Sequence, residues 1–121
     1  MILLIDDDEF YRSVIRRILE DEGHQVIEAL DGAEGLDMYK TYQPALVLTD
    51  MRMPGMDGAE VIRSIRAMNR RARIIAVSGA GTFYNVDYVK LAKEVGADAI
   101  LRKLDSTDRV LVEVGRLLEA V

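Results

Sequence analysis

Acidic side chains stand at two places in this sequence where short apolar runs end. The run 6–9 reads Asp-Asp-Asp-Glu and Asp50 follows a second apolar run, while Ser78 and Lys103 follow two more. Carboxylates that lie together repel one another and need a cation, and Mg²⁺ takes one or two carboxylates together with phosphate oxygens as ligands. An aspartate in such a group can act as a nucleophile and form an aspartyl-phosphate. The four segments together predict acid, metal and phosphoryl chemistry.

Each of these residues also has an ordinary explanation. Acids favour helix N-termini, where the run 6–9 stands, and an aspartate such as Asp50 suits a turn at a strand end. A lone serine or lysine is most often a loop or surface residue, which would describe Ser78 and Lys103. The prediction rests on their joint occurrence at four strand ends. There the metal, the lysine and the hydroxyl would stabilise the charge of the phosphoryl oxygens.

The rest of the sequence predicts the scaffold that brings these residues together. Apolar runs predict strands at 2–5, 25–29, 45–49, 73–77 and 97–101. Apolar residues at helical spacing predict helices over 9–22 and 32–41, from a capping box of Asp57 and Glu60, over roughly 86–95, and along a final stripe from Val110 to Val121. The segment 79–85 is predicted as a glycine-bearing loop.

The order of these elements predicts the fold class. Strands that are apolar on both faces and alternate with helices are typical of a parallel sheet with right-handed crossovers. The prediction is an α/β fold: a doubly wound, five-stranded parallel sheet with five helices. Ligands bind beside the carboxyl ends of the strands in such folds. That edge is where the acids, the serine and the lysine stand.

Composition narrows the class of protein further. The chain has 121 residues, of which 50% are hydrophobic and 31% charged, which is the balance of one globular domain. It has no cysteine, which excludes disulfides and thiolate chemistry. A formal net charge of −5 argues against direct nucleic-acid binding. Since no apolar run is long enough to span a membrane and no signal peptide is evident, we expect a cytoplasmic protein that does not bind membranes.

The stretch 50–58, Asp-Met-Arg-Met-Pro-Gly-Met-Asp-Gly, resembles the D-x-x-M-P-x-M-D-G run of response-regulator receiver domains in two-component signalling. The start of the chain, 2–8, is similar to the acidic signature of their first strand. The resemblance covers essentially the whole chain. It implies a CheY-like, flavodoxin-like (βα)5 fold, with one receiver domain over 1–121 and no output domain in this chain.

The resemblance also implies the partners and the reaction. A phosphoryl group would pass from the phosphohistidine of a histidine kinase or histidine phosphotransfer protein to an aspartate. Mg²⁺, or Mn²⁺, would be the cofactor. The domain would signal to a downstream protein target, as a monomer or a phosphorylation-linked dimer. It would not be an enzyme beyond its own phosphorylation and slow dephosphorylation.

Residue by residue, the resemblance implies a metal and phosphorylation site. Asp50 matches the phospho-acceptor. Asp6 and Asp7 match the acidic pair that holds the metal, together with Asp50 and the backbone carbonyl of Arg52.

Other positions match residues around the phosphoryl group. Ser78, Gly79 and Lys103 match the residues that stabilise it. Pro54 and Gly55 match the turn after the phosphorylation site, and such a tight turn fixes where the aspartate points.

The family's switch residues are altered here. Ser78 is retained, but Ile100 stands where an aromatic residue is usual, and Leu104 replaces the proline after Lys103. The segment after Ser78 is longer than expected. Tyr84, or the neighbouring Phe83, is a candidate replacement for the mobile aromatic, and packing against the helix 86–95 is the alternative. The expected signalling surface comprises that helix, the strand 97–101 and the final helix.

Two other functions stay open at this point. A degenerate receiver would bind partners without being phosphorylated, and the altered switch positions favour it. A haloacid-dehalogenase-type phosphatase would use the Asp-x-Asp within 6–8, but Phe10 stands where that motif has threonine, and the late acidic motif is missing. A flavodoxin is disfavoured because the acids at 6–9 would repel the cofactor phosphate.

Overall fold

The computed structural model describes residues 1–79, 82–83 and 86–119. Five strands form a parallel sheet: β1 (Ile2–Ile5), β2 (Val26–Ala29), β3 (Leu46–Asp50), β4 (Ile74–Ser78) and β7 (Ala99–Arg102). Five helices connect and follow them: α1 (Glu9–Asp21), α2 (Gly32–Tyr42), α3 (Gly58–Met68), α4 (Tyr88–Glu94) and α5 (Thr107–Glu119). The strand order is β2-β1-β3-β4-β7. The predicted fold class is confirmed.

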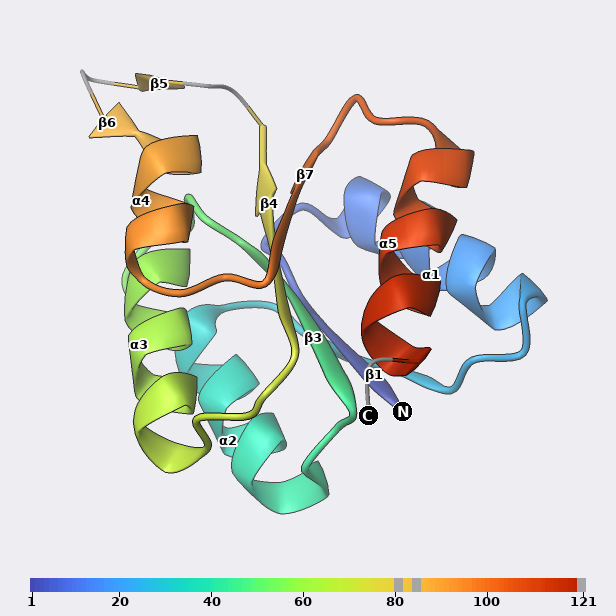
Figure 1. The fold of residues 1–121 in the computed structure, drawn as a ribbon, viewed down its shortest axis with the longest axis horizontal. Coiled ribbons are helices and arrows are strands. Elements are labelled where there is room, and N and C mark those ends of the chain that lie inside the picture. Colours follow the sequence, from blue (N-terminus) through green and yellow to red (C-terminus); the bar gives the residue numbers. More distant parts are fainter. Residues whose placement is uncertain (80–81, 84–85, 120–121) are drawn as a thin grey trace.

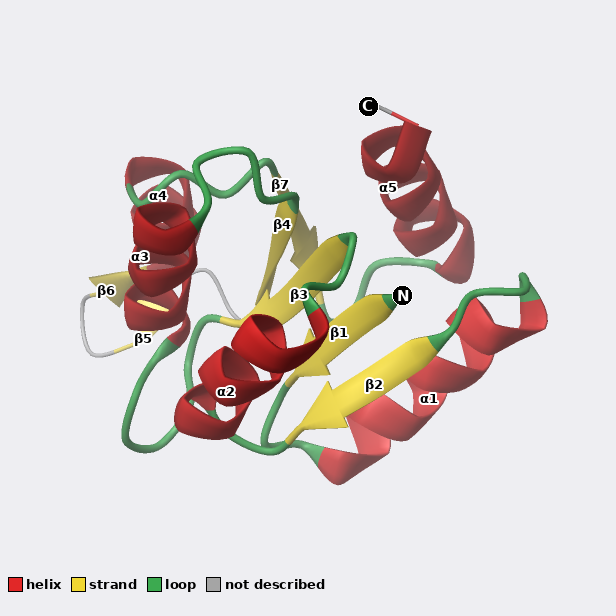
Figure 2. Cartoon of the chain, turned by 90° about the horizontal axis from the view of Figure 1, so that it is seen from below, coloured by secondary structure: helices red, strands yellow, loops and turns green. Residues whose placement is uncertain are grey.

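The sheet separates two helical layers. The helices α1 and α5 cover one face, and α2, α3 and α4 cover the other (Figures 1 and 2). Successive side chains of a strand point to opposite faces. In β1, Leu3 and Ile5 therefore join the cluster under α2, α3 and α4, while Ile2 and Leu4 join the cluster under α1 and α5. All four are at most 4% exposed, so the apolar run of β1 is buried on both faces.

Aspartates cap the N-termini of four of the helices. The side chains of Asp8, Asp31, Asp57 and Asp87 each accept a hydrogen bond from the backbone N–H three residues further on. For the predicted capping box, the Asp57 carboxylate accepts from the Glu60 N–H at 3.0 Å. These caps fix where the loops at the carboxyl edge of the sheet turn into helix.

The segment between β4 and α4 differs from the prediction of a loop and a helix over 86–95. β5 (Thr82–Phe83) and β6 (Val86–Asp87) pair as an antiparallel hairpin. Because Asp87 is extended and caps α4, the helix begins only at Tyr88. The predicted switch candidate Tyr84 lies outside the described residues.

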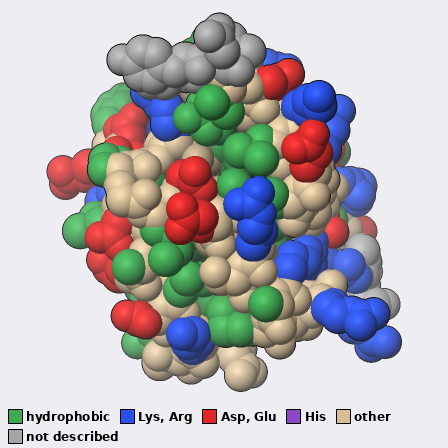
Figure 3. Space-filling model, turned by 90° about the vertical axis from the view of Figure 1, so that its left-hand side faces the viewer, with side chains coloured by type: hydrophobic (Ala, Val, Ile, Leu, Met, Phe, Trp, Pro, Cys, Tyr) green, Lys and Arg blue, Asp and Glu red, His purple; other side chains and the backbone are tan. Residues whose placement is uncertain are grey.

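The outer face of the α2, α3 and α4 layer is charged but mixed. Figure 3, which views the molecule from that side, shows Lys and Arg side chains and Asp and Glu side chains among hydrophobic ones. Within the described residues, no helix is both long and apolar enough to cross a membrane.

Arg66 links the end of α3 to the two segments that precede β4 and β7. Its guanidinium donates to the carbonyl of Gly96 at 2.7 Å and to the Asp98 carboxylate at 2.9 Å, and it also donates to the carbonyl of Ala72. The same carboxylate accepts from the N–H of Ile74 at 2.8 Å. One side chain thus satisfies acceptors that precede β4 and β7.

Replacing Arg66 with methionine should lower the free energy of unfolding by about 1–3 kcal/mol, because several acceptors lose their donor at once. Arg63→Met is the matched control, since Arg63 is an exposed arginine on the same helix. We expect it to change stability by less than about 0.5 kcal/mol. Urea unfolding measures the free energy of unfolding of both variants. Equal losses of stability would contradict the role of Arg66 in linking these segments.

Candidate functional site

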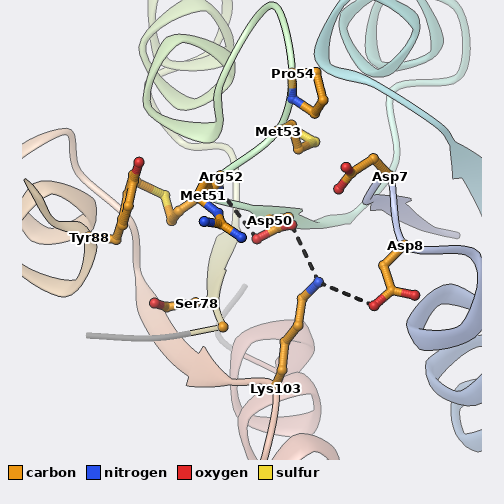
Figure 4. A pocket seen from close by; sticks show the side chains of 11 residues that line it. Asp7, Asp8, Asp50, Met51, Arg52, Met53, Pro54, Ser78, Tyr88 and Lys103 are labelled. Carbon is orange, nitrogen blue, oxygen red and sulfur yellow. Dashed lines mark hydrogen bonds and ion pairs between the residues drawn. The ribbon is translucent and has the colours of Figure 1, made fainter. Parts of the chain in front are cut away.

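The carboxyl ends of four strands meet around one pocket. Asp6 follows β1, Asp50 and Ser78 are the last residues of β3 and β4, and Lys103 follows β7. The parallel register places Asp50 beside Val77, and the neighbouring strands end at the same edge. The pocket has a volume of about 760 Å³, and its lining comes from 7–8, 50–54, 78–79, Tyr88 and Lys103. Figure 4 shows Asp7 and Lys103 pointing toward Asp50.

Three carboxylates at this edge of the sheet could hold a metal ion. Asp6, Asp7 and Asp50 each offer an oxygen, and these oxygens lie within 4.8 Å of one another. Asp6 and Asp50 are only 4% and 5% exposed, whereas Asp7 is exposed. The buried Asp6 Oδ2 atom accepts no hydrogen bond among the described residues, and Lys103 Nζ lies 3.1 Å from it as an ion pair. Three clustered carboxylates, two of them buried, fit a hard divalent cation.

Lys103 supplies the positive charge among these acids. Its Nζ lies 3.1 Å from Asp6 Oδ2, 3.4 Å from Asp50 Oδ2 and 3.8 Å from Asp8 Oδ2. Burial alone would lower the pKa of Lys103, but the negative charges of Asp50 and Asp6 raise it above its usual value. The lysine therefore stays protonated and serves two buried carboxylates at once.

One lysine does not neutralise both buried acids. Burial, and then the charge of Asp6, raise the pKa of Asp50 to about 7, although Lys103 and the backbone N–H of Arg52 oppose that shift. Burial likewise raises the pKa of Asp6. Two carboxylates that resist ionisation form a site where added positive charge is favourable.

The other predicted site residues surround this group. Ser78 is 2% exposed, and its carbonyl accepts from the backbone N–H of Lys103 at 3.0 Å, which ties the ends of β4 and β7. A Cβ on Gly79 would lie 3.8 Å from the Lys103 side chain, so Gly79 flanks the lysine stem. Arg52 lines the pocket and donates its N–H to Asp50 Oδ1 at 3.4 Å.

The turn after Asp50 carries the predicted Pro54 and Gly55. Gly55 has a φ of +75°, and a Cβ there would meet nothing within 4 Å. The glycine is therefore needed for its backbone conformation and not for space. The turn leads the chain from Asp50 to the start of α3.

The structure leaves one predicted switch residue outside the pocket. Ile100 lies in β7 and packs against the cluster under α2, α3 and α4. Leu104, which follows Lys103, is 94% exposed. The structure thus brings Asp6, Asp7, Asp50, Ser78 and Lys103 together but not Ile100.

Three residues that the family resemblance does not match to the site also reach it. Asp8 caps α1 and faces Lys103, Tyr88 lines the pocket from α4, and the ring of Tyr11 lies over Lys103. Asp8 belongs to the acidic run 6–9 that the sequence analysis singles out. The two tyrosines could not be found from the sequence, because their approach depends on how α1 and α4 pack against the sheet.

Comparisons with known proteins agree with this geometry. The family model for the response regulator receiver domain matches residues 2–114. The chain is 36% identical over 119 residues to the chemotaxis protein CheY of Halobacterium salinarum, covering 98% of this chain and 97% of that protein. It is 33% identical over 96 residues to sporulation initiation phosphotransferase F of Bacillus subtilis, covering 79% and 75%. The receiver domain of NtrX from Brucella abortus superimposes with a TM-score of 0.91 at 28% identity, covering 100% of both chains.

Proposed function

Because this chain belongs to the response regulator receiver domain family of two-component signalling, we propose that Asp50 accepts a phosphoryl group from a phosphohistidine donor. The observation that carries the proposal is the meeting of three carboxylates and Lys103 at one sheet edge. The donor would be a histidine kinase or a histidine phosphotransfer protein. The receiver would present a changed surface to a downstream protein target.

The proposed step is a displacement at phosphorus. An Asp50 oxygen attacks, the bond from phosphorus to the donor imidazole nitrogen breaks, and that nitrogen keeps the electron pair. Asp6, Asp7, Asp50 and the backbone carbonyl of Arg52 would hold Mg²⁺ or Mn²⁺, which would supply positive charge beside the phosphoryl oxygens.

Protein groups would stabilise the rest of the phosphoryl charge. Lys103 Nζ lies 3.4 Å from Asp50 Oδ2, so it is placed to bind an oxygen carried by that carboxylate. Ser78 and Gly79 line the same pocket and would complete the oxygen contacts. Residues 1–121 would act as one receiver unit, with no catalysis beyond their own phosphorylation and slow dephosphorylation.

The proposed signalling surface comprises α4, β7 and α5. Phosphorylation adds about −1.5 to −2 charge and draws hydrogen-bond donors toward it. The hydrogen bond from Lys103 to the Ser78 carbonyl joins β4 to β7, so a shift of Ser78 would reach β7 directly. Ile100 has no ring to move, and the response would rest on the backbone of β7 and the start of α4.

The test is the intact mass of the protein after incubation with acetyl phosphate, with and without Mg²⁺. We expect one phosphoryl adduct that requires Mg²⁺. Asp50→Asn should carry none. Asp57→Asn is the matched control from the same motif, because asparagine also caps helices and should leave the adduct unchanged.

Two outcomes would contradict the proposal. An adduct on the Asp50→Asn protein would show that a residue other than Asp50 accepts the phosphoryl group. The binding-only receiver would be favoured if the wild type forms no adduct and if beryllofluoride, a mimic of the phosphoryl group, does not stabilise it against thermal unfolding. Turnover of a generic phosphate ester would instead favour the hypothesis of a haloacid-dehalogenase-type phosphatase.

Metal binding has its own expected result. A ligand that binds only the folded state raises its stability, so saturating Mg²⁺ should add about 1–3 kcal/mol. Asp7→Asn should lose most of that gain, because it removes the charge of one of the three carboxylates that could hold the ion. Asp108→Asn, an exposed acid of α5, should keep it. Thermal unfolding with and without Mg²⁺ measures the gain, and equal gains in both variants would place the metal elsewhere.

A further inference from the structure

Tyr11 approaches the site from the layer of α1 and α5. Its ring centroid lies 5.0 Å from Lys103 Nζ. The side chain is partly buried and packs against the cluster that α1 and α5 share. With Asp6 and Asp50 it also lines a small cavity behind the carboxylates. Tyr11 thus brings an aromatic ring from α1 next to the ammonium group of Lys103.

The local structure holds this ring in place. Tyr11 lies in the first turn of α1, and its backbone N–H donates to the capping Asp8 carboxylate at 3.2 Å. Burial, and then the charges of Asp6, Asp50 and Asp105, raise the pKa of the Tyr11 phenol. The ring therefore stays neutral and keeps the electron-rich face that attracts an ammonium group.

We propose that Tyr11 is a positioning residue for Lys103: its ring face keeps the ammonium group directed at Asp50. This inference rests on the proposed phosphoryl transfer to Asp50. A lysine carries its charge on a flexible, strongly hydrated side chain, so its placement needs support. The carboxylates provide that support only while they are charged and unoccupied.

The contact between the Tyr11 ring and Lys103 matters most when Asp50 is phosphorylated and Asp6 faces a cation. Once Asp50 carries a phosphoryl group and Asp6 faces a cation, both ion pairs with Lys103 change. The attraction between the ring and the ammonium group depends on neither carboxylate. Tyr11 would therefore hold the lysine through the change of charge that phosphorylation brings.

Two substitutions at Tyr11 distinguish the effect of the aromatic ring face from the effect of side-chain volume. Tyr11→Phe keeps the aromatic face, and Tyr11→Leu keeps apolar volume without it. We measure the maximal rate of phosphorylation by acetyl phosphate and the half-saturating donor concentration, with the thermal midpoint of each variant. Tyr11→Phe should stay close to wild type, whereas Tyr11→Leu should lower the maximal rate about three- to tenfold.

A double-mutant cycle makes the assignment specific to Lys103. In a Lys103→Met background, Tyr11→Leu should have no further effect on the rate. An equal loss with and without Lys103 would show a structural role and overturn the proposal. Wild-type rates in Tyr11→Leu would overturn it too, as would a loss in Tyr11→Phe as large as in Tyr11→Leu.

A second measurement needs no phosphorylation. In the metal-free protein, NMR signals of the Lys103 side chain, assigned with Lys103→Met, should move in Tyr11→Leu and stay near wild type in Tyr11→Phe. If the wild type takes no phosphoryl group, the proposed function fails, and these signals still decide whether Tyr11 positions Lys103. Unmoved signals in Tyr11→Leu would refute the contact.

Discussion

Replacing Gly58 with alanine should destabilise the protein by more than about 3 kcal/mol, because a Cβ there would collide with backbone atoms. The added atom would lie 2.2 Å from the Asp50 carbonyl oxygen and 2.6 Å from the Met51 Cα. Neither can rotate away as a side chain could. Since Gly58 begins α3 and donates its N–H to the Met51 carbonyl at 3.0 Å, the collision would also shift the strand end that carries Asp50.

The matched control is the same substitution in α5. A Cβ at Gly115 would meet nothing within 4 Å. Alanine favours a helix interior over glycine by about 1 kcal/mol, so Gly115→Ala should stabilise the protein. Urea unfolding measures both. If Gly58→Ala unfolds at the wild-type urea concentration, the close approach of α3 to β3 is wrong.

Replacing Asp50 with asparagine should stabilise the metal-free protein, increasingly so as the pH rises. The pKa of Asp50 is about 7 in the folded protein against a usual value of 3.8, mainly because of burial and then the charge of Asp6. The folded state thus binds the proton more tightly than the unfolded state does. The stabilisation from that proton is complete below pH 3.8 and is lost as the pH rises through 7.

Asparagine has no proton to lose at this position. The difference in unfolding free energy between Asp50→Asn and wild type should therefore grow between pH 5 and pH 8, reaching about 2–4 kcal/mol. Urea unfolding in the presence of a chelator measures it. Asp108→Asn corrects for the change in net charge. A difference that shrinks as the pH rises would contradict the burial of an ionised Asp50.

The sequence was sufficient for the sheet and for most of the site. Apolar runs such as 45–49 are predicted to be buried on both faces, and this burial together with the alternation of strands and helices predicts the parallel sheet. In that fold the residues at strand ends converge, which is why Asp6, Asp50 and Lys103 could be placed together. The structure brings these predicted residues to one edge of the sheet, where Asp50 and Lys103 line the pocket.

Features that depend on tertiary packing could not be predicted in the same way. The hairpin of β5 and β6 has only two residues in each strand, too few for a periodic signal. The contact of Tyr11 with Lys103 joins the first turn of α1 to the residue after β7. It depends on how α1 packs beside the sheet, which the helical spacing of 9–22 does not specify.

The two hydrophobic clusters on opposite faces of the sheet have a consequence for protein engineering. Because the strand backbones divide them, Leu3 and Ile2 are chain neighbours that belong to different interiors. Substitutions in one interior should combine additively with substitutions in the other. Libraries of the two layers can therefore be screened separately and then recombined. Specificity for a partner could be redesigned on one layer while thermal tolerance is improved on the other.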